Sequence, residues 1–527
     1  MKVTPVEEFT KPPKEEMTKV KKPKFRKIFS RYADIASLNG VAIIKDSKSP
    51  IVKAIWAFLL LAAIGAMIYH LYSLFTKFFQ YEKHAEIDMS FSNLPFPAVT
   101  ICNANIMRFS KQDLASAEIQ DLVEKVSTSY KQIVDANDYN SISDFDSALD
   151  FLDNSSQYED QEYFYDDYPT VDDSVTQSED DEVDASIFSK AESQFQELFS
   201  QMDVETQRKV GHTLEDLIVQ CTIGRKPCRN FKNFTVTTTS SFGNCYTIEY
   251  KNYTASKNGP DGGLELVLFL ELDEYLPGIT GGKGAQIVIH PQGSYPFVEE
   301  EGIPIAAGSQ TIISLKQIQI ERLGDPYNKC TNNGDQDFGT YSYTRSLCQK
   351  KCALSIIIQN CSCYDKDFKG LNSLLNVSST LKACSGSEQT KCRLNVTKNY
   401  KDEDSTCNCN NPCSESIYDK SISTKQWPSK AMARSLIKEV CNKSDRCDEL
   451  WGLNSEDLQE NFVKLNIYFQ DLNFEKRAEQ PNYELFQLLS DFGGTIGLWI
   501  GLSILAIFEL FDVLFQLVHC VICGRRK

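Results

Sequence analysis

The chain has 527 residues, of which 42% are hydrophobic, 11% aromatic and 24% charged, and its 55 Lys and Arg against 72 Asp and Glu give a net charge of −17. This acidic balance argues against a nucleic-acid-binding protein, whose surface has to be basic to neutralise phosphates. The 18 cysteines predict that most of the chain folds in an oxidising compartment.

Two long apolar segments predict a membrane protein. The first occupies residues 51–79 and the second residues 492–522, and each exceeds the ~20 residues that a helix needs to cross a bilayer. Basic residues cluster before the first segment and after the second, which predicts that both termini are cytoplasmic. The predicted order is a cytoplasmic N-terminus at 1–50, a first transmembrane helix at 51–79, an extracellular domain at 80–481, a second transmembrane helix at 482–522 and a cytoplasmic C-terminus at 523–527.

The contents of the long segment between the two predicted helices agree with an extracellular position. It holds 16 of the cysteines, an even number that suits disulfides. Zinc is the alternative for its C-x-C and C-x₃-C spacings, but five histidines in the whole chain offer few further ligands. Cys520 and Cys523 lie in or below the membrane and should stay reduced. The same segment carries candidate N-glycosylation sequons at Asn154, Asn233, Asn252, Asn376, Asn395 and Asn442.

Apolar patterns predict a mixed α+β extracellular domain. A strand-like run at 96–105 precedes a helical pattern at 111–133, and a second helical pattern covers 187–219. Further strand-like runs occur at 234–240, 264–272, 286–290, 311–320 and 462–470, and further helical patterns at 341–358 and 428–441. In the 264–272 run, the alternation suits a sheet with one buried face. We expect a central, mainly antiparallel sheet with peripheral helices.

An acidic segment at 144–184 interrupts the helical part of this domain. It contains 16 acidic residues, no Lys or Arg, and seven aromatic residues. One interpretation is a solvated, poorly ordered insertion. The other is a recognition surface for a cationic, aromatic ligand, because carboxylates and ring faces both attract cations.

The second apolar segment has the composition of an ion pathway. Glu509 and Asp512 are carboxylates within or just below it, where they are costly unless they face water or a partner. Small residues, which permit close packing or exposed backbone carbonyls, occur at Gly493, Gly494, Gly497, Gly501 and Ser503. Small residues together with carboxylates favour a cation pathway over mere helix packing. One helix cannot enclose a pore, so several subunits must surround an axis.

Specific motifs resemble the degenerin/epithelial sodium channel superfamily, which includes acid-sensing and peptide-gated channels. The resemblance rests on FPAVTICN (96–103), GNCYTI (243–248), DEYLP (273–277), the cysteines between 330 and 413, LNFE (472–475) and DFGGTIGLWIGLSILAIFELFD (491–512). It implies a trimer in the plasma membrane, as a homotrimer or a heterotrimer, with a clenched-hand extracellular domain. Finger-like helices would occupy 111–220, and a disulfide-rich thumb and knuckle 330–442.

The resemblance also implies the disulfide pairing. The pairs would be Cys102–Cys245, Cys221–Cys228, Cys330–Cys413, Cys348–Cys409, Cys352–Cys407, Cys361–Cys392 and Cys363–Cys384, which leaves Cys441–Cys447 as an additional pair.

Individual pore and gating positions follow from the same resemblance. The selectivity filter would be Gly501-Leu502-Ser503, in which Leu502 stands at a position that varies in the family. Asp491 would ring the outer mouth, and Ser490 matches the position where bulky residues hold such channels open. Other implied gating residues are the linker pair Leu472 and Asn473, the aromatic pair Tyr81 and Tyr327, and the re-entrant Asn39-Gly40, in which Asn39 replaces the histidine of the family.

The predicted function is that of a pore-forming subunit of a sodium-selective, amiloride-sensitive cation channel, opened by an extracellular amidated neuropeptide of FMRFamide type. Proton gating and constitutive or mechanical gating are the alternatives within the superfamily. A purinergic receptor would need a basic cluster for phosphate, and a two-span scavenger-type receptor would not need Glu509 and Asp512. We find no enzyme motif, so we expect neither catalytic activity nor a cofactor or structural metal.

Overall fold

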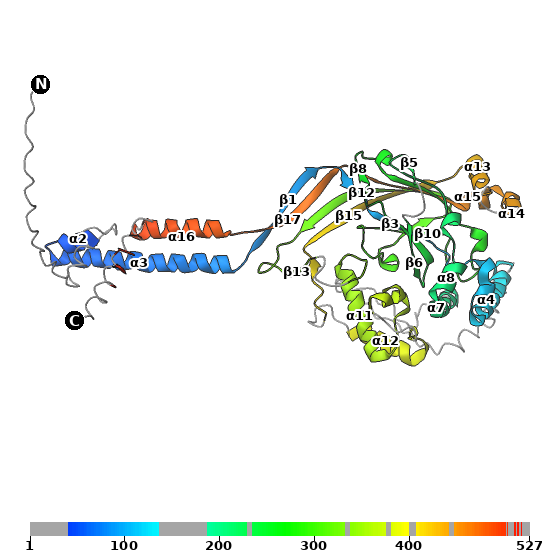
Figure 1. Ribbon diagram of the computed structural model, residues 1–527, viewed down its shortest axis with the longest axis horizontal. Coiled ribbons are helices and arrows are strands. Elements are labelled where there is room, and N and C mark those ends of the chain that lie inside the picture. Colours follow the sequence, from blue (N-terminus) through cyan, green and yellow to red (C-terminus); the bar gives the residue numbers. More distant parts are fainter. Residues whose placement is uncertain are drawn as a thin grey trace, which may run out of the picture. The chain divides into compact units, whose positions relative to one another are not determined.

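The computed structural model describes residues 41–135, 187–228, 234–332, 338–375, 381–399, 407–441 and 447–501, with seven further residues between 503 and 518. The chain divides into two compact units, one made of Met1–His84 with Gln480–Lys527 and the other of Ala85–Glu479. Figure 1 shows the elements of both units. The second unit nearly coincides with the predicted extracellular domain at 80–481. The acidic segment 144–184 lies outside the described residues.

The first unit consists of helices α2 (Val41–Asp46), α3 (Pro50–Phe79) and α16 (Leu485–Ile500). With 30 residues and a mean hydropathy of 2.3, α3 is, within the described part of the chain, the helix that is long and apolar enough to cross a membrane. α16 has 16 residues and lies alongside α3 (Figure 1), with the rings of Phe75 and Phe492 6.0 Å apart. α16 ends at Ile500, and the second transmembrane helix predicted over 482–522 stays a prediction.

The finger-like part of the second unit contains two packed helices. The 3-10 helix η1 (Phe109–Leu114) leads into α4 (Ala117–Asp135), and α7 (Ile187–Gln201) packs against α4 through Ala191, Phe195 and Phe199. The helical pattern predicted over 187–219 is divided among α7 and two shorter helices, and its last two residues belong to a strand. Asp203 and Thr213 cap two new helices, α8 (Val204–Val210) and α9 (Leu214–Leu217), with their side chains. Strand β4 then begins at Ile218, inside the predicted 111–220 region.

An eight-stranded sheet forms the centre of the second unit, with the order β1-β17-β12-β16-β9-β4-β5 and with β15 also paired to β12. The strands are β1 (Lys83–Phe91), β4 (Ile218–Ile223), β5 (Lys226–Pro227), β9 (Leu264–Phe269), β12 (Ser309–Glu321), β15 (Ser414–Gln426), β16 (Phe462–Phe469) and β17 (Asn473–Pro481). β15 runs antiparallel to β12 along its whole length, so the predicted 330–442 region includes a strand of the central sheet.

The central sheet is mixed rather than wholly antiparallel. β16 pairs in parallel with the first half of β12, and β17 pairs in parallel with its second half. After β15 the chain passes through α13 (Lys430–Cys441), α14 (Cys447–Gly452) and α15 (Ser455–Glu460), so that it re-enters the sheet in the direction of β12. These helices cover Val267 and Phe269 of β9. Both faces of β9 are consequently buried, instead of the one face predicted.

A second, five-stranded sheet packs against the first. Its order is β11-β10-β3-β7-β6, and all of its pairings are antiparallel. The strands are β3 (Ala98–Asn103), β6 (Phe234–Thr239), β7 (Gly243–Ile248), β10 (Gly284–His290) and β11 (Ile303–Ala306). The main hydrophobic core contains Val99 and Ile101 of this sheet together with Leu266 of β9 and Leu465 of β16.

Short elements complete the second unit. They are the strand pairs β2 (Leu94–Pro95) with β8 (Thr254–Ala255) and β13 (Cys330–Thr331) with β14 (Asn411–Pro412), and the short helices η4 (Pro260–Gly262), η5 (Leu272–Glu274) and α10 (Val298–Glu301).

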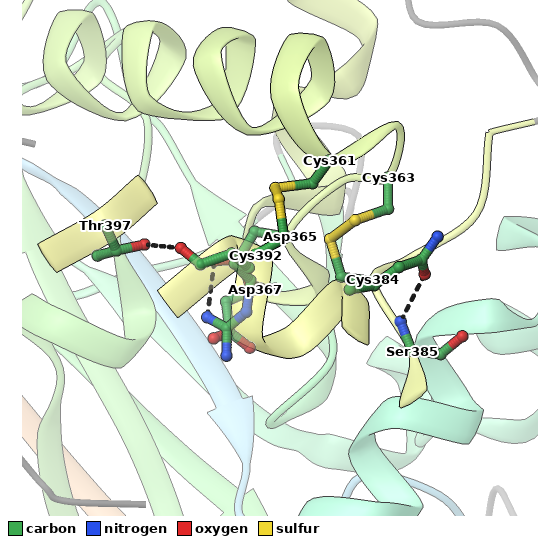
Figure 2. The surroundings of a disulfide bond; sticks show 10 residues. Cys361, Cys363, Asp365, Asp367, Cys384, Ser385, Cys392 and Thr397 are labelled. Carbon is green, nitrogen blue, oxygen red and sulfur yellow. Dashed lines mark hydrogen bonds and ion pairs between the residues drawn. A yellow bond between two sulfur atoms is a disulfide. The ribbon is translucent and has the colours of Figure 1, made fainter. Parts of the chain in front are cut away.

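The disulfide-rich region contains α11 (Arg345–Cys361), η6 (Lys366–Leu375) and α12 (Gly386–Asn399), with α11 and α12 side by side. Figure 2 shows how two disulfides, Cys361–Cys392 and Cys363–Cys384, join the end of α11 to the chain around α12. Among the described residues, the structure forms the seven pairs that the resemblance implied and also the additional pair Cys441–Cys447. Such cross-links stabilise a region with small cores, by roughly 2–4 kcal/mol each.

Candidate functional site

Helix α16 has two distinct faces. On one face, Leu488 and Thr495, which are seven residues apart, are buried, with exposed fractions of 6% and 5%. Ser490, Gly494 and Gly497 follow one another at spacings of four and three residues on the other side of the helix, and all three are exposed. In the described part of the chain, a Cβ at Gly494 would meet no atom within 4 Å apart from its own stretch of helix. The described residues of one subunit therefore leave the small-residue face of α16 uncovered.

The helix ends where the filter was predicted. Gly501 adopts φ 73° and ψ 14°, in the left-handed region, and its N–H donates to the carbonyl of Gly497 at 3.0 Å. The last carbonyls of a helix lack intrahelical partners and carry the negative end of its dipole, which favours cations. Ser503 is exposed just beyond this break. Leu502 lies outside the described residues.

The predicted carboxylates occupy both sides of this break in the sequence. Asp491 is half-buried and accepts a hydrogen bond from the hydroxyl of Tyr483 at 2.6 Å. The ammonium of Lys77 in α3 lies 5.1 Å from the centre of the Tyr483 ring, so this tyrosine joins the outer ends of α3 and α16. Asp512 is exposed, whereas Glu509 lies outside the described residues.

The predicted gating residues fall at chain junctions. Leu472 is buried at the short link between β16 and β17, and Asn473 binds the carboxylate of Asp471 through its backbone and its side chain. Tyr81 follows α3 in the left-handed conformation, with φ 50°, and belongs to the first unit, whereas Tyr327 belongs to the second. Their predicted contact stays a prediction. Asn39 and Gly40 lie outside the described residues.

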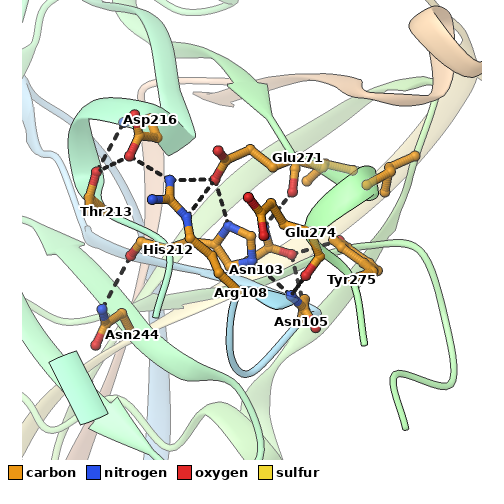
Figure 3. A network of polar contacts seen from close by, with 12 residues as sticks. Asn103, Asn105, Arg108, His212, Thr213, Asp216, Asn244, Glu271, Glu274 and Tyr275 are labelled. Carbon is orange, nitrogen blue, oxygen red and sulfur yellow. Dashed lines mark hydrogen bonds and ion pairs between the residues drawn. The ribbon is translucent and has the colours of Figure 1, made fainter. Parts of the chain in front are cut away.

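A buried polar network, which the sequence analysis missed, joins three loops of the second unit (Figure 3). Arg108 lies between β3 and η1, and its guanidinium binds the carboxylate of Glu271 at 2.6 Å and that of Asp216 at 2.5 Å. Glu271 lies between β9 and η5 and also contacts Nδ1 of His212 at 2.8 Å. His212 is 2% exposed. Glu271 itself takes the left-handed conformation, with φ 53°, which is uncommon for a residue with a side chain.

Asn105 fixes the orientation of the histidine ring. Its amide oxygen accepts from the backbone N–H of Leu276 at 3.2 Å and from the hydroxyl of Thr280 at 2.7 Å, which leaves its amide nitrogen as the donor. That nitrogen lies 3.0 Å from Nε2 of His212 and also donates to the carbonyls of Met107 and Glu274. Nδ1 of the ring thus faces Glu271, and Nε2 faces Asn105.

The network sets the charge of its carboxylate. Burial raises the pKa of Glu271, but the hydrogen bonds and charges of His212 and Arg108 together outweigh burial and bring the pKa below its ordinary value. Burial likewise lowers the pKa of Arg108, and Glu271 and Asp216 outweigh it and raise that pKa. The network is thus an ion pair at neutral pH that holds the loops after β3 and β9 together.

Two of the predicted glycosylation sites are exposed in the structure. Asn252 lies before β8, and Asn395 lies on α12. Asn154, Asn233, Asn376 and Asn442 lie outside the described residues.

The family of the chain follows from comparison with known proteins. Residues 32–513 match the family described as "Amiloride-sensitive sodium channel". The chain belongs to this family.

Similar members come from two branches of the superfamily. Acid-sensing ion channel 2 of Mus musculus is 28% identical over 503 residues, which cover 92% of this chain and 86% of the relative. The beta subunit of the epithelial sodium channel of Bos taurus is 26% identical over 561 residues, covering 94% and 83%. The gamma-2 subunit of the epithelial sodium channel of Xenopus laevis is 26% identical over 555 residues, covering 94% and 80%.

Membership in the amiloride-sensitive sodium channel family decides the class of function. Its members are plasma-membrane channels that conduct sodium, are sensitive to amiloride and assemble from several subunits. This chain is accordingly a sodium channel of the degenerin/epithelial sodium channel superfamily and not an enzyme. The purinergic and scavenger-type alternatives are excluded with it.

Proposed function

We propose that the chain is the pore-forming subunit of a trimeric, sodium-selective channel whose ion pathway is lined by α16 and by residues 501–503. The carrying observation is that α16 breaks at Gly501, on the same side of the helix as Ser490, Gly494 and Gly497. Three such faces around an axis would bring small side chains and free carbonyls together, which is the arrangement that replaces the hydration shell of a cation. In this arrangement the chain spans the bilayer twice, with both termini cytoplasmic.

Carboxylates then lie on either side of the filter in this proposal. Asp491, one turn before Thr495, would surround the outer mouth, and Glu509 and Asp512 would follow on the cytoplasmic side. Rings of carboxylates raise the local concentration of cations. Amiloride would block from the outer mouth, because it is a cation.

Opening by an extracellular amidated peptide of FMRFamide type is our proposal for gating. The acidic and aromatic composition of residues 144–184 supports it, since such a peptide carries a positive charge and aromatic rings. The chain link at Leu472 and Asn473 would carry the movement towards α16, because β17 leads directly to that helix. Deletion of residues 144–184 tests the ligand site: loss of the peptide response with normal surface expression supports it, and an unchanged response contradicts it.

Proton gating is the second candidate, and the buried network supports it. The network holds three buried ionisable side chains, those of Arg108, His212 and Glu271, at a point where three loops meet, and acid-sensing ion channel 2 is among the relatives. His212→Asn would abolish an acid-evoked current if this network were the sensor.

Voltage clamp of cells that express the full chain distinguishes the two candidates. We expect an inward sodium current, blocked by amiloride, when a short amidated peptide containing Arg and Phe is applied. A current evoked by acid alone would favour the proton-gated alternative. Absence of sodium current under peptide, acid and steady conditions would contradict the proposed pore.

A further inference from the structure

The C-terminal end of α7 is held by a lysine from another part of the fold. The ammonium of Lys369, in η6, donates to the carbonyl oxygens of Ser200 at 2.7 Å and Met202 at 2.5 Å, and it lies 3.3 Å from Oε1 of Gln207. These three acceptors match the three donors of a lysine ammonium. The end of a helix, where carbonyls lack partners and the dipole is negative, is a favourable place for such a cation.

Two further side chains complete this cap. The amide nitrogen of Gln207 donates to the carbonyl of Phe199 at 2.5 Å, and the hydroxyl of Tyr364 donates to the carbonyl of Ser200 at 3.3 Å. Gln207 belongs to α8, whereas Tyr364 and Lys369 come from the disulfide-rich region. The carbonyls at the end of α7 therefore accept hydrogen bonds both from α8 and from the disulfide-rich region.

The two partners of this contact differ in how they are anchored. η6 begins five residues after Cys361 and three after Cys363, and both cysteines are in disulfides (Figure 2). α7 begins at Ile187, three residues after the last acidic residue of 144–184, and it packs on α4, which ends at Asp135. Lys369 thus connects a cross-linked region to the helix that follows the acidic segment.

Burial disfavours the charged form of Lys369. Burial lowers the pKa of the Lys369 ammonium to about 8, and the charge of Asp203, at the start of α8, opposes burial only in part. Because the pKa lies below its ordinary value of 10.5, removal of the proton would favour the folded state rather than weaken it. The three hydrogen bonds to oxygens of Ser200, Met202 and Gln207 hold the ammonium in this buried position.

We propose that Lys369 is a positioning residue that couples α7 to the disulfide-rich region, so that the two move together when the channel opens. The ligand that starts this movement rests on the proposed function, but the mechanical coupling does not. Lys369→Met keeps the length and the apolar stem of the side chain while removing the charge and all three donors. Lys369→Arg keeps a cation with several donors. Lys382→Met is the matched control, because Lys382 is an exposed lysine of the same region.

Hydrogen exchange of the purified full-length channel tests the coupling without any agonist. For Lys369→Met we expect exchange at the end of α7 and in η6 to rise at least tenfold, with wild-type amounts at the cell surface. Lys369→Arg should return exchange to within about threefold of wild type, and Lys382→Met should not differ from it. Unchanged exchange at the end of α7 in Lys369→Met would overturn the proposal, as would a rise confined to α7 with η6 unaffected.

Voltage clamp of the same variants separates this inference from the proposed gating. If the peptide opens the wild-type channel, Lys369→Met should need at least tenfold more peptide for half-maximal current, with rescue by Lys369→Arg. An unchanged peptide response in Lys369→Met would overturn the role of the coupling in opening. A wild-type channel that ignores the peptide refutes the proposed ligand only, and the exchange result still decides the coupling.

Discussion

Substitution of Gly501 by alanine tests the break in α16. Gly501 has φ 73°, where a side chain costs about 1–2 kcal/mol. Alanine also favours a continuous helix over glycine by about 1 kcal/mol. Together these terms amount to about 2–3 kcal/mol, which shifts the equilibrium from the broken to the continuous helix roughly 30- to 150-fold. A continuous helix would pair the carbonyls that we assign to sodium.

The assay for this substitution is the reversal potential with sodium outside and potassium inside the cell. We expect Gly501→Ala to lower the sodium-to-potassium permeability ratio towards 1 while the protein still reaches the surface. Gly494→Ala is the matched control, since Gly494 lies in the helical part of the same face and a Cβ there would meet none of the described residues outside its own stretch of helix within 4 Å. An unchanged ratio in Gly501→Ala, or an equal loss in Gly494→Ala, would refute the reasoning.

Three further predictions address other parts of the structure. Glu271→Gln removes one of the two carboxylates that bind the buried guanidinium of Arg108, so thermal unfolding of the purified channel should shift down by the equivalent of about 1.5–3 kcal/mol; no shift would contradict an ion pair. Folding lowers the pKa of Glu271, so its carboxylate stabilises the folded channel above the ordinary pKa of 4.5, and this stabilisation is lost as the pH falls below that value. The unfolding temperature of Glu271→Gln should therefore fall less steeply with acidification than that of the wild type. Tyr483→Phe frees the carboxylate of Asp491, so unitary sodium conductance at low ionic strength should rise, whereas Asp491→Asn should lower it; equal conductance in all three channels would remove Asp491 from the pathway. Asn252→Gln should increase gel mobility by one glycan, and identical mobility would show that this exposed sequon is unused.

Local patterns in the sequence predicted the elements that local chemistry determines. The runs at 234–240 and 311–320 are strands β6 and β12, and the pattern at 428–441 is α13. The breaks in 187–219 were also readable in principle, because Asp203 and Thr213 are good N-cap residues three positions before the backbone N–H groups that they bind. Apolar periodicity alone does not reveal such caps when the apolar spacing continues unchanged from one helix to the next.

Contacts between distant segments could not be predicted in the same way. The parallel pairing of β12 with β16 depends on the path of 35 residues through α13, α14 and α15, which hydropathy does not encode. Arg108, His212 and Glu271 lie on three loops more than 50 residues apart, and each resembles an ordinary surface residue until the sheets bring them together. The face of α16 that we propose to line the pore became visible only when burial separated Leu488 from Ser490.

The most direct measurement for the proposed pore is the accessibility of cysteines placed on the two faces of α16. A cationic thiol reagent applied from outside should change the sodium current of Ser490→Cys at least tenfold faster than that of Leu488→Cys, because Ser490 is on the uncovered face and Leu488 is 6% exposed. Equal rates, or faster modification of Leu488→Cys, would show that another face of the helix borders the sodium pathway.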